Sequence, residues 1–223
     1  MAVCVLIPAY NAELTLGPVV RECVGFGYPV VVVDDGSSDG SAGVAAGEAV
    51  TILCHRVNQG KGKALRTGFQ WALDHGFDMV VTIDADGQHD ASALPGLVDA
   101  AEAADADIMI ASRFSQFEEM AGARKVWNRF GVWCMRKRTG FEISDSQSGF
   151  RCYSGRLLRT LTLESSGYDL EMEILMKAWR HGFVIASLPV AARVADGRST
   201  SHYRPFRDTW NICMTFLRYM YRS

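Results

Sequence analysis

Short apolar segments that alternate with helix-forming segments over residues 1–112 constrain the fold of this 223-residue chain more than any other feature. The apolar runs VCVLI, VVVV and MVVTI are nearly uninterrupted, which predicts strands that are buried on both faces of a sheet. The alternating order predicts an α/β fold with a mostly parallel, doubly wound sheet flanked by helices. The predicted strands are Val3–Ile7, Val30–Asp34, Thr51–His55, Met79–Asp84 and Asp107–Ala111, and the predicted helices are Glu13–Val24, Asp39–Ala49, Gly62–His75 and Ser92–Ala104.

The second half of the chain has a less regular pattern. It predicts helices at Ala123–Arg138, Leu170–His181 and Pro205–Tyr221, and strands at Gly149–Tyr153, Phe183–Leu188 and Val190–Val194. No internal repeat or low-complexity linker interrupts the chain, so we expect a single domain over residues 1–223.

The charge is unevenly distributed between the two halves. Residues 1–112 carry 5 Lys and Arg against 15 Asp and Glu, whereas residues 113–223 carry 18 against 10. This asymmetry indicates an acidic face that binds metal and a basic face that meets phosphate or an anionic surface, or else a chance distribution over a solvated surface. The overall net charge of −2 argues against a bulk affinity for nucleic acid.

The cysteines and the apolar runs bear on location. None of the six cysteines forms a CxxC pair, so we expect reduced, buried thiols of a cytoplasmic protein. The N-terminus has no basic region before its apolar run, and no run reaches the roughly 18 residues that span a bilayer. Two basic, aromatic-rich segments, Arg124–Arg138 and Trp210–Arg222, are candidates for peripheral contact with the inner face of a membrane. Their alternative role is to pack on the domain with their arginines in water.

Two aspartates follow the buried MVVTI run, in the segment Asp84-Ala-Asp86-Gly-Gln88-His89-Asp90. Carboxylates this close repel each other unless a cation neutralises them. Mg²⁺ and Mn²⁺ prefer oxygen ligands and commonly bridge protein carboxylates to substrate phosphates. We therefore interpret Asp84 and Asp86 as metal ligands, with Gln88 as a neutral oxygen donor. The alternative is an acidic turn that caps the following helix.

Three other loops follow predicted strands or open predicted helices. In Val31–Gly40, Asp35 is a candidate contact for a base or a ribose, and Asp39 a helix cap. In Ile7–Glu13, we expect the strand to stop at Pro8; Tyr10 can stack on a base and Glu13 can bind ribose, although the residues alone favour a simple turn. The loop Asn58–Lys63 offers backbone N–H groups and lysines to a diphosphate but lacks the full spacing of the commonest phosphate loop.

The ordered set of motifs along the chain resembles glycosyltransferase family 2, and most closely its polyprenyl-phosphate branch, typified by dolichyl-phosphate mannose synthase. The resemblance extends from Val3 to about Asp208. The motifs are IPAYN, VVVDDGSSDGS, NQGKGKALRTGF, DADGQHD, ASRF, DSQSGFR and YDLEMEILMKAWRHGF. It implies a GT-A type fold, a UDP- or GDP-linked sugar donor, a polyprenyl phosphate acceptor, and Mg²⁺ or Mn²⁺.

The resemblance also implies roles for individual residues. Pro8, Tyr10 and Glu13 would line the nucleoside pocket, Asp35 would hold the base or ribose, and Lys63 would lie near the nucleotide. Asp84, Asp86 and Gln88 would form the metal site, and Arg113 and Arg124 would meet the acceptor phosphate. Asp145, Ser148, Gly149, Phe150 and Arg151 would lie near the donor sugar, and Arg198 and Ser201 in a loop over the diphosphate. Residues 1–112 would then bind donor and metal, and residues 113–223 the acceptor.

The expected mechanism depends on the acceptor. A polyprenyl phosphate already carries an anionic nucleophile, so in-line attack at the anomeric carbon would invert its configuration without a strong base. A hydroxyl acceptor, on a saccharide or another molecule, would require a base, for which Asp145 is the best candidate. The alternative for Asp145 is a structural role in the turn before Gly149.

Two rival functions come from other classes of protein. A nucleotidyltransferase shares the sheet and the acidic metal site, but usually has a Gly-rich loop with Arg or Lys after its first strand, where this chain has Pro8-Ala-Tyr-Asn. A non-catalytic nucleotide-sugar binder is the second rival, and the intact Asp84 and Asp86 pair argues against it. The sugar, the choice between UDP and GDP, and the oligomeric state stay open.

Overall fold

The structure is a computed structural model that describes residues 1–112, 148–191 and 205–221. Within these residues a seven-stranded sheet has the order β3-β2-β1-β4-β6-β5-β7. The strands are β1 Val3–Ala9, β2 Val30–Asp34, β3 Thr51–Cys54, β4 Met79–Thr82, β5 Ile108–Ser112, β6 Arg151–Ser154 and β7 Ile185–Pro189. The helices are α1 Glu13–Gly25, α2 Ser41–Ala46, α3 Lys61–Asp74, η1 Ala91–Ala93, α4 Leu94–Ala103, α6 Gly155–Thr160, α7 Leu170–Arg180 and α8 Pro205–Tyr221.

The sheet is mostly parallel, as the sequence predicts. Parallel pairs join β1 to β2, β1 to β4, β2 to β3, and β5 to β7. Only β6 runs the other way, between β4 and β5. The carboxyl ends of β1, β2 and β4 therefore meet at one edge of the sheet, where parallel α/β sheets bind their ligands.

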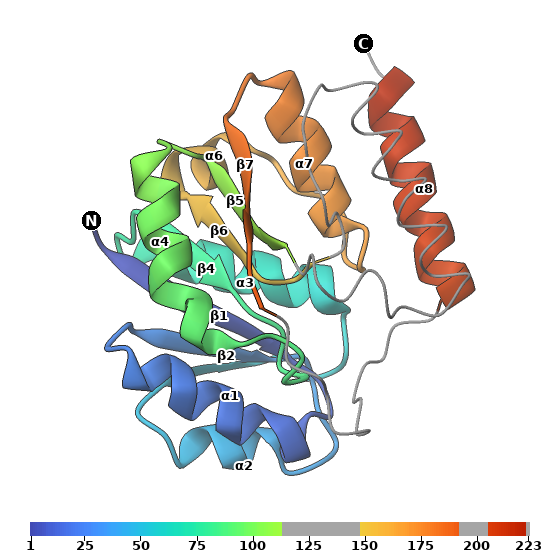
Figure 1. Cartoon of the computed structure of the whole chain (residues 1–223). Helices are drawn as coiled ribbons and strands as arrows, with labels where there is room; N and C mark the ends of the chain where they lie inside the picture. The colour runs from blue at the N-terminus through green and yellow to red at the C-terminus, as the bar shows by residue number, and fades with distance from the viewer. Residues whose placement is uncertain (113–147, 192–204, 222–223) are drawn as a thin grey trace.

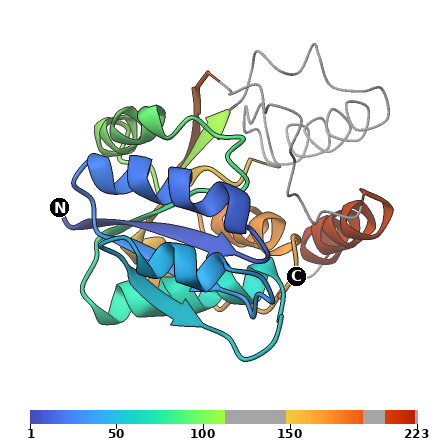
Figure 2. The ribbon, with the colours of Figure 1, turned by 90° about the horizontal axis from the view of Figure 1, so that it is seen from below.

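Helices cover both faces of the sheet (Figures 1 and 2). Alternate residues of β1 point to opposite faces, so Val5 and Ile7 pack with α1 and α4, while Cys4 and Leu6 pack with α3, α6 and α7. All residues of β1, β2 and β4 are buried, which confirms the prediction from their uninterrupted apolar runs. The last helix, α8, lies against α7 on the outside of this second layer.

Several predicted boundaries differ from the structure. The strand β1 does not stop at Pro8 but continues to Ala9, whose carbonyl accepts a hydrogen bond from the Asp35 N–H at 2.8 Å. Along β1, the backbone groups of successive residues form hydrogen bonds alternately with β2 and with β4. Val5 and Ala9 bond on the β2 side, so the backbone of Pro8, which has no N–H, faces the β4 side. Pairing on that side has already ended at Leu6, so the missing donor costs β1 no hydrogen bond to β2.

Other differences concern element length and two cysteines. The predicted helix Asp39–Ala49 is only Ser41–Ala46, with glycines at both ends, and β7 begins at Ile185 and ends at Pro189. Cys54 is exposed, not buried, because it ends the edge strand β3, and Cys213 on α8 is only partly buried. The predicted helix Ala123–Arg138 and residues 192–194 of the predicted strand Val190–Val194 lie outside the described residues.

The helix α3 lies so close to β1 that only glycine fits at residue 68. A Cβ atom there would lie 2.2 Å from Leu6 Cδ1, and Leu6 is fully buried. The absence of a side chain therefore sets the distance between α3 and β1.

Replacing Gly68 with Ala is expected to lower the free energy of unfolding by about 1–3 kcal/mol, because the added methyl overpacks a closed core. Gly96→Ala on α4 is the matched control, since a Cβ there meets nothing within 4 Å; it should leave stability unchanged or raise it by up to about 1 kcal/mol. Urea unfolding of both variants provides the measurement. Equal stability of the two would show that α3 does not pack this tightly.

Candidate active site

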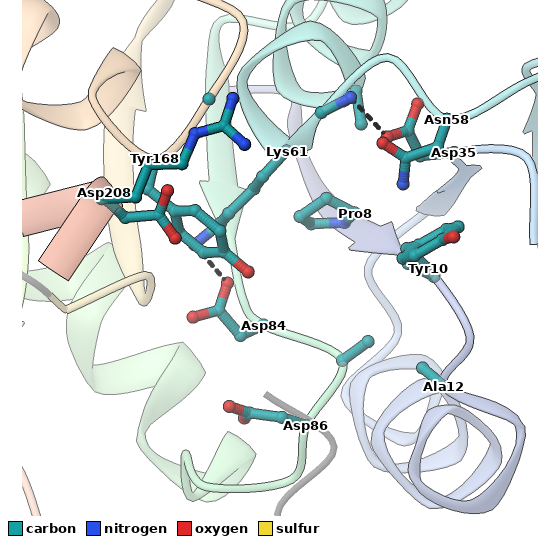
Figure 3. Close-up of a pocket in the computed structure, with 16 residues that line it drawn as sticks. Pro8, Tyr10, Ala12, Asp35, Asn58, Lys61, Asp84, Asp86, Tyr168 and Asp208 are labelled. Atoms are coloured by element: carbon teal, nitrogen blue, oxygen red, sulfur yellow. Dashed lines mark hydrogen bonds and ion pairs between the residues drawn. The ribbon is translucent and has the colours of Figure 1, made fainter. Parts of the chain in front are cut away.

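A cavity of about 530 Å³ opens at the carboxyl ends of β1, β2 and β4 (Figure 3). Its walls come from the loops that follow these strands, from the first turn of α3, from the segment before α7 and from the first turn of α8. The residues that line it are Pro8, Ala9, Tyr10, Ala12, Asp35, Asn58, Gly60, Lys61, Ala64, Asp84, Ala85, Asp86, Gly167, Tyr168, Arg207 and Asp208.

The loops after β1 and β2 brace each other beside this cavity. The braces join backbone N–H groups to polar side chains: Asn11 N to Ser37 Oγ, Ala12 N to Ser41 Oγ, Glu13 N to Asp39 Oδ2, Ser38 N to Asn11 Oδ1, and Gly40 N to Glu13 Oε2. The polar residues of the motifs IPAYNAE and DDGSSDGS therefore serve to hold these two loops together. The Glu13 carboxylate binds the Gly40 N–H and does not line the cavity, so its predicted contact with ribose gains no support from this geometry.

Asp35 ties the end of β2 to the loop that leads into α3. Its carboxylate accepts hydrogen bonds from the Gln59 N–H at 3.0 Å and the Gly60 N–H at 2.7 Å, and lies 2.6 Å from His55 Nδ1. Only 3% of its side chain is exposed, yet it forms part of the cavity wall. Asp35 thus shapes this end of the cavity, and its contact with a base or ribose stays a prediction.

The glycines before and after Lys61 allow the segment before α7 to pack on the start of α3. Gly60 has a φ of +99°, and a Cβ there would lie 2.4 Å from the Ser166 carbonyl oxygen. A Cβ on Gly62 would lie 2.6 Å from the Gly167 carbonyl oxygen. This packing turns Lys61 into the cavity, whereas Lys63, the lysine predicted to lie near the nucleotide, does not line it.

Lys61 joins three elements through two carboxylates. Its Nζ lies 2.7 Å from Asp84 Oδ1 and 3.2 Å from Glu171 Oε1, and only 13% of its side chain is exposed. Burial alone would lower the pKa of Lys61, but the charges of Asp84 and Glu171 outweigh it and raise the pKa. The lysine therefore stays positively charged inside the cavity.

Asp84 and Asp86 both point into the cavity from the loop after β4 (Figure 3). Gln88 donates its backbone N–H to Asp86 Oδ1 at 3.0 Å, which fixes that carboxylate, but its side chain does not line the cavity. Among the described residues, no group of three or more His, Cys, Asp or Glu forms a complete metal cage. The donor set fits an ion that takes oxygen ligands and completes its shell with phosphate, as Mg²⁺ and Mn²⁺ do.

The turn before β6 packs against the Asp84 carboxylate. A Cβ on Gly149 would lie 2.2 Å from Asp84 Oδ2, so only glycine leaves room for this carboxylate. Thr82 Oγ1 donates to the Gly149 carbonyl at 2.9 Å, and the fully buried Arg151 donates to the Ser148 carbonyl at 2.6 Å. Ser148 and Arg151 therefore hold the turn in place and do not line the cavity, in contrast to their predicted place beside the donor sugar.

The structure thus brings together five of the predicted site residues, Pro8, Tyr10, Asp35, Asp84 and Asp86. Arg113, Arg124, Asp145, Arg198 and Ser201 lie outside the described residues, so their roles stay predictions. Sequence reasoning named Asn58 and Lys61 only as parts of the candidate diphosphate loop Asn58–Lys63, and it assigned no role to Tyr168, Arg207 and Asp208. The Gly-Lys-Gly spacing was the available signal for Lys61, and Tyr168 begins the motif YDLEMEILMKAWRHGF; Arg207 and Asp208 had no signal.

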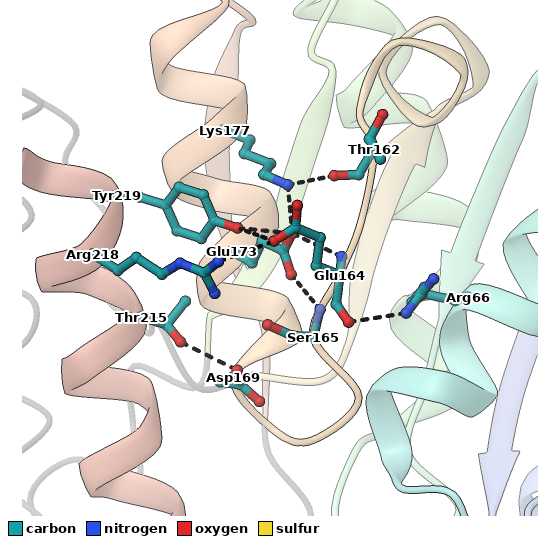
Figure 4. Close-up of polar contacts among 10 residues, drawn as sticks. All are labelled: Arg66, Thr162, Glu164, Ser165, Asp169, Glu173, Lys177, Thr215, Arg218 and Tyr219. Carbon is teal, nitrogen blue, oxygen red and sulfur yellow. Dashed lines mark hydrogen bonds and ion pairs between the residues drawn. The ribbon is translucent and has the colours of Figure 1, made fainter. Parts of the chain in front are cut away.

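The wall formed by α8 is held to the domain by polar contacts with α7 and the segment before it (Figure 4). Glu173, whose side chain is fully buried, accepts hydrogen bonds from the Ser165 N–H at 2.7 Å, Lys177 Nζ at 2.6 Å and Tyr219 Oη at 3.2 Å. Burial opposes ionisation of Glu173, but the bonds from Lys177 and Ser165 outweigh it and place its pKa below the ordinary value. The ionised carboxylate of Glu173 thus holds α8 against α7 through its hydrogen bond from Tyr219.

The comparisons with known proteins agree with this arrangement. The sequence profile described as "Glycosyl transferase family 2" matches residues 4–164. The chain is 34% identical over 205 residues to the undecaprenyl-phosphate mannosyltransferase of Micrococcus luteus, covering 85% of this chain and 83% of that protein. It is 31% identical over 201 residues to the polyprenol monophosphomannose synthase of Mycolicibacterium smegmatis, covering 83% and 75%.

Among solved structures, the fold is similar to that of glucosyl-3-phosphoglycerate synthase from Mycobacterium tuberculosis in complex with Mn²⁺, uridine diphosphate and phosphoglyceric acid. The TM-score is 0.80 at 19% identity, and the match covers 100% of this chain and 79% of that chain. This likeness confirms the expected GT-A type fold.

Replacing Glu173 with Gln tests how α8 is held. The variant should be less stable than the wild type at about pH 7, by about 1–3 kcal/mol, because buried hydrogen-bond donors lose an ionised partner. The lowered pKa stabilises the fold above the ordinary value of 4.5, and this contribution is lost as pH falls through the lowered pKa. The difference between the two proteins should therefore shrink below pH 4.5 in urea unfolding.

Glu164→Gln is the control, because Glu164 pairs with Arg218 at the surface, where both side chains are about half exposed. Its effect should be small at either pH. A stability difference for the Glu173 variant that does not change with pH would contradict an ionised role for this residue.

Proposed function

The chain belongs to glycosyl transferase family 2 and is an enzyme that transfers sugars, and we propose that it moves a sugar from a UDP- or GDP-linked donor to a polyprenyl phosphate. Two relatives at 31–34% identity over most of the chain, named for undecaprenyl phosphate and polyprenol, support this acceptor. The observation that carries the proposal is the cavity in which Asp84, Asp86 and Lys61 meet beside Pro8, Tyr10 and Asp35.

The donor would lie along the cavity with its nucleoside between Pro8 and Asp35. Tyr10 offers a ring for stacking, and Asp35 and Asn58 offer polar atoms to base or ribose at the same end (Figure 3). The diphosphate would then lie between the start of α3 and the carboxylates of Asp84 and Asp86, which follow β4. A helix N-terminus favours such an anion, and Lys61 adds a full positive charge there.

Asp84 and Asp86 would hold a divalent ion, either Mg²⁺ or Mn²⁺; the predicted third ligand, Gln88, gains no support from this geometry, because its side chain does not line the cavity. The fold relative crystallised with Mn²⁺ and uridine diphosphate supports this choice. When bound, such an ion neutralises charge on the leaving diphosphate. Lys61, whose Nζ lies 2.7 Å from Asp84 Oδ1, would contribute a positive charge beside the diphosphate. Glu171, 3.2 Å from the same Nζ, would hold the lysine at the site.

The acceptor phosphate oxygen would attack the anomeric carbon from the side opposite the diphosphate. The new C–O bond forms as the bond to the diphosphate breaks, so the configuration inverts and no strong base is needed. Arg113 and Arg124 are proposed to hold the acceptor phosphate bidentately. If the acceptor is instead a hydroxyl group, Asp145 is proposed as the base.

In this proposal the two halves of the chain bind different substrates. Residues 1–112 would provide most of the donor and metal site, and residues 113–223 the acceptor site. Four lining residues of the cavity, Gly167, Tyr168, Arg207 and Asp208, nevertheless come from the second half. The last helix would thus contribute to the donor site although it belongs to the half of the chain that is proposed to bind the acceptor.

The face of α8 that points away from the domain suggests how a lipid acceptor is reached. Trp210, Met214 and Leu217 are 67%, 46% and 40% exposed, and their spacing places them along one face of the helix. The first turn of the same helix lines the cavity. No helix in the described part of the chain is long and apolar enough to cross a membrane. We therefore propose peripheral contact with the bilayer through this face of α8.

A transfer assay tests the function. It combines Mn²⁺ or Mg²⁺ with a panel of UDP- and GDP-sugars and a short-chain polyprenyl phosphate, and follows release of nucleoside diphosphate and formation of glycolipid. Metal-dependent glycolipid supports the proposal and identifies the donor. Donor hydrolysis without glycolipid would overturn the acceptor and favour a hydroxyl group with Asp145 as base.

Asp86→Asn is expected to lower the metal-dependent transfer rate at least about 100-fold, because the proposed ion loses a charged ligand. Asp90→Asn is the matched control: Asp90 lies in the same loop, accepts the Ser92 N–H at 3.0 Å and does not line the cavity. Asparagine preserves that cap, so this variant should keep most of its activity. Similar rates for the two variants would remove Asp86 from the metal site.

Trp210→Glu should reduce binding to vesicles that contain anionic lipid about tenfold, because an exposed indole that would enter the bilayer interface is replaced by a negative charge. Phe26→Glu is the control, since Phe26 is also exposed, at 41%, but follows α1 at the opposite edge of the sheet from the cavity. Co-sedimentation with vesicles measures both. Equal binding by the two variants would exclude this face of α8 from the membrane.

A further inference from the structure

Two positively charged side chains, Lys61 and Arg207, line the cavity in the described part of the chain. The Lys61 Nζ is nearly enclosed and lies 2.7 Å and 3.2 Å from the carboxylates of Asp84 and Glu171. Arg207 differs, because it is exposed and its guanidinium forms no hydrogen bond or ion pair among the residues that the structure describes. Its charge is therefore open to a ligand at the α8 wall of the cavity.

Arg207 also begins the exposed face of α8. Four exposed residues follow one another along this helix at intervals of three and four positions: Arg207, Trp210, Met214 and Leu217. Such spacing places side chains on one face of a helix. The opposite face carries Tyr219, which is buried and points toward α7 (Figure 4). The exposed face thus has a cation at the cavity end and apolar side chains beyond it.

The length of this face can be estimated from the rise of an α-helix. Arg207 lies about 4.5 Å along the axis from Trp210, and the apolar part continues for about another 10 Å to Leu217. One continuous strip therefore starts as a positive charge at the cavity wall and goes on as apolar surface outside it. This pattern is complementary to a ligand that has an anionic head and a hydrocarbon chain.

The proposed reaction needs a cation on the acceptor side of the cavity. It brings a second phosphate beside the diphosphate of the donor, in a cavity that Asp84, Asp86 and Asp208 also line. Like charges at such short range repel unless cations offset them. Lys61 would lie beside the diphosphate, whereas Arg207 offers its charge from another element. Its planar guanidinium can bind two phosphate oxygens at once.

We propose that Arg207 binds the phosphate of the lipid acceptor at the α8 wall of the cavity, while the hydrocarbon chain lies along Trp210, Met214 and Leu217. This inference rests on the proposed function, because it assumes a lipid phosphate acceptor. It assigns to the described part of the chain a residue that holds the acceptor, in addition to the arginines expected for this role from the sequence.

Transfer to a water-soluble, short-chain prenyl phosphate tests the assignment without a bilayer. Arg207→Gln should raise the KM for this acceptor about tenfold, which corresponds to the loss of one charge-assisted hydrogen bond. The KM for the nucleotide-sugar and the Kd of the nucleoside diphosphate with Mn²⁺ should change less than about twofold, because the diphosphate binds elsewhere in the cavity. Arg207→Lys keeps the charge without the planar fork, so its acceptor KM should fall between those of the wild type and Arg207→Gln.

Arg218→Gln is the matched control. Arg218 is also an exposed arginine of α8, but it does not line the cavity and lies 3.3 Å from Glu164 at the far end of the helix. Removing its charge should leave the acceptor KM unchanged. If it raises this KM as much as Arg207→Gln does, the general charge of the helix is responsible and the assignment fails.

Two other results would also overturn the assignment. If Arg207→Gln raises the donor KM or the Kd of the nucleoside diphosphate as much as the acceptor KM, Arg207 belongs to the donor site. If it weakens co-sedimentation with vesicles that contain anionic lipid but leaves the KM for the soluble acceptor unchanged, Arg207 meets the head groups of the bilayer instead.

The wild type alone separates this inference from the proposed function. If it binds a nucleoside diphosphate but transfers no sugar to any prenyl phosphate, the proposed acceptor is wrong and the role of Arg207 is overturned with it. If it forms glycolipid and Arg207→Gln does so with the same acceptor KM, only the role of Arg207 is overturned.

Discussion

The ion cluster of Lys61 with Asp84 and Glu171 is the interaction on which the rest of the site depends. It joins the first residue of α3, the loop after β4 and the first turn of α7, three elements that are far apart in the sequence. Parallel strands bring acidic loops to one edge of the sheet, where the carboxylates would repel one another. A buried lysine between two of them makes this edge stable before any ligand binds.

Several motif residues are explained by the space this cluster needs. Gly60 and Gly62 let residues 166–167 pack on α3 and direct Lys61 into the cavity, and Gly149 leaves room for the Asp84 carboxylate. Asp35 closes the same loop from the other side by binding the N–H groups of Gln59 and Gly60. Glycines and aspartates that are far apart in the sequence thus all help to position Lys61 between Asp84 and Glu171.

The sequence predicts the strands and the acidic pair well, because uninterrupted apolar runs mark buried strands and polar residues follow where they end. Pro8, Tyr10, Asp35, Asp84 and Asp86 could be placed on that basis. The choice of Lys61 over Lys63 depends on the packing of residues 166–167, for which the glycines on both sides of Lys61 are the local signal. Asp208 reaches the cavity only because Glu173 and Tyr219 dock α8, and Arg151, expected beside the sugar, is fully buried instead.

We propose that Asp84 and Asp86 hold a metal ion against the diphosphate of a nucleotide at the carboxyl ends of β1 and β4. A crystal structure with Mn²⁺ and the nucleoside diphosphate that binds, with anomalous data for manganese, would locate both. We expect one anomalous peak within about 2.5 Å of a carboxylate oxygen of Asp84 or Asp86, with the nucleoside beside Pro8 and Tyr10. A manganese peak away from both aspartates, or a nucleotide outside this cavity, would show that Asp84 and Asp86 do not hold the metal against the diphosphate.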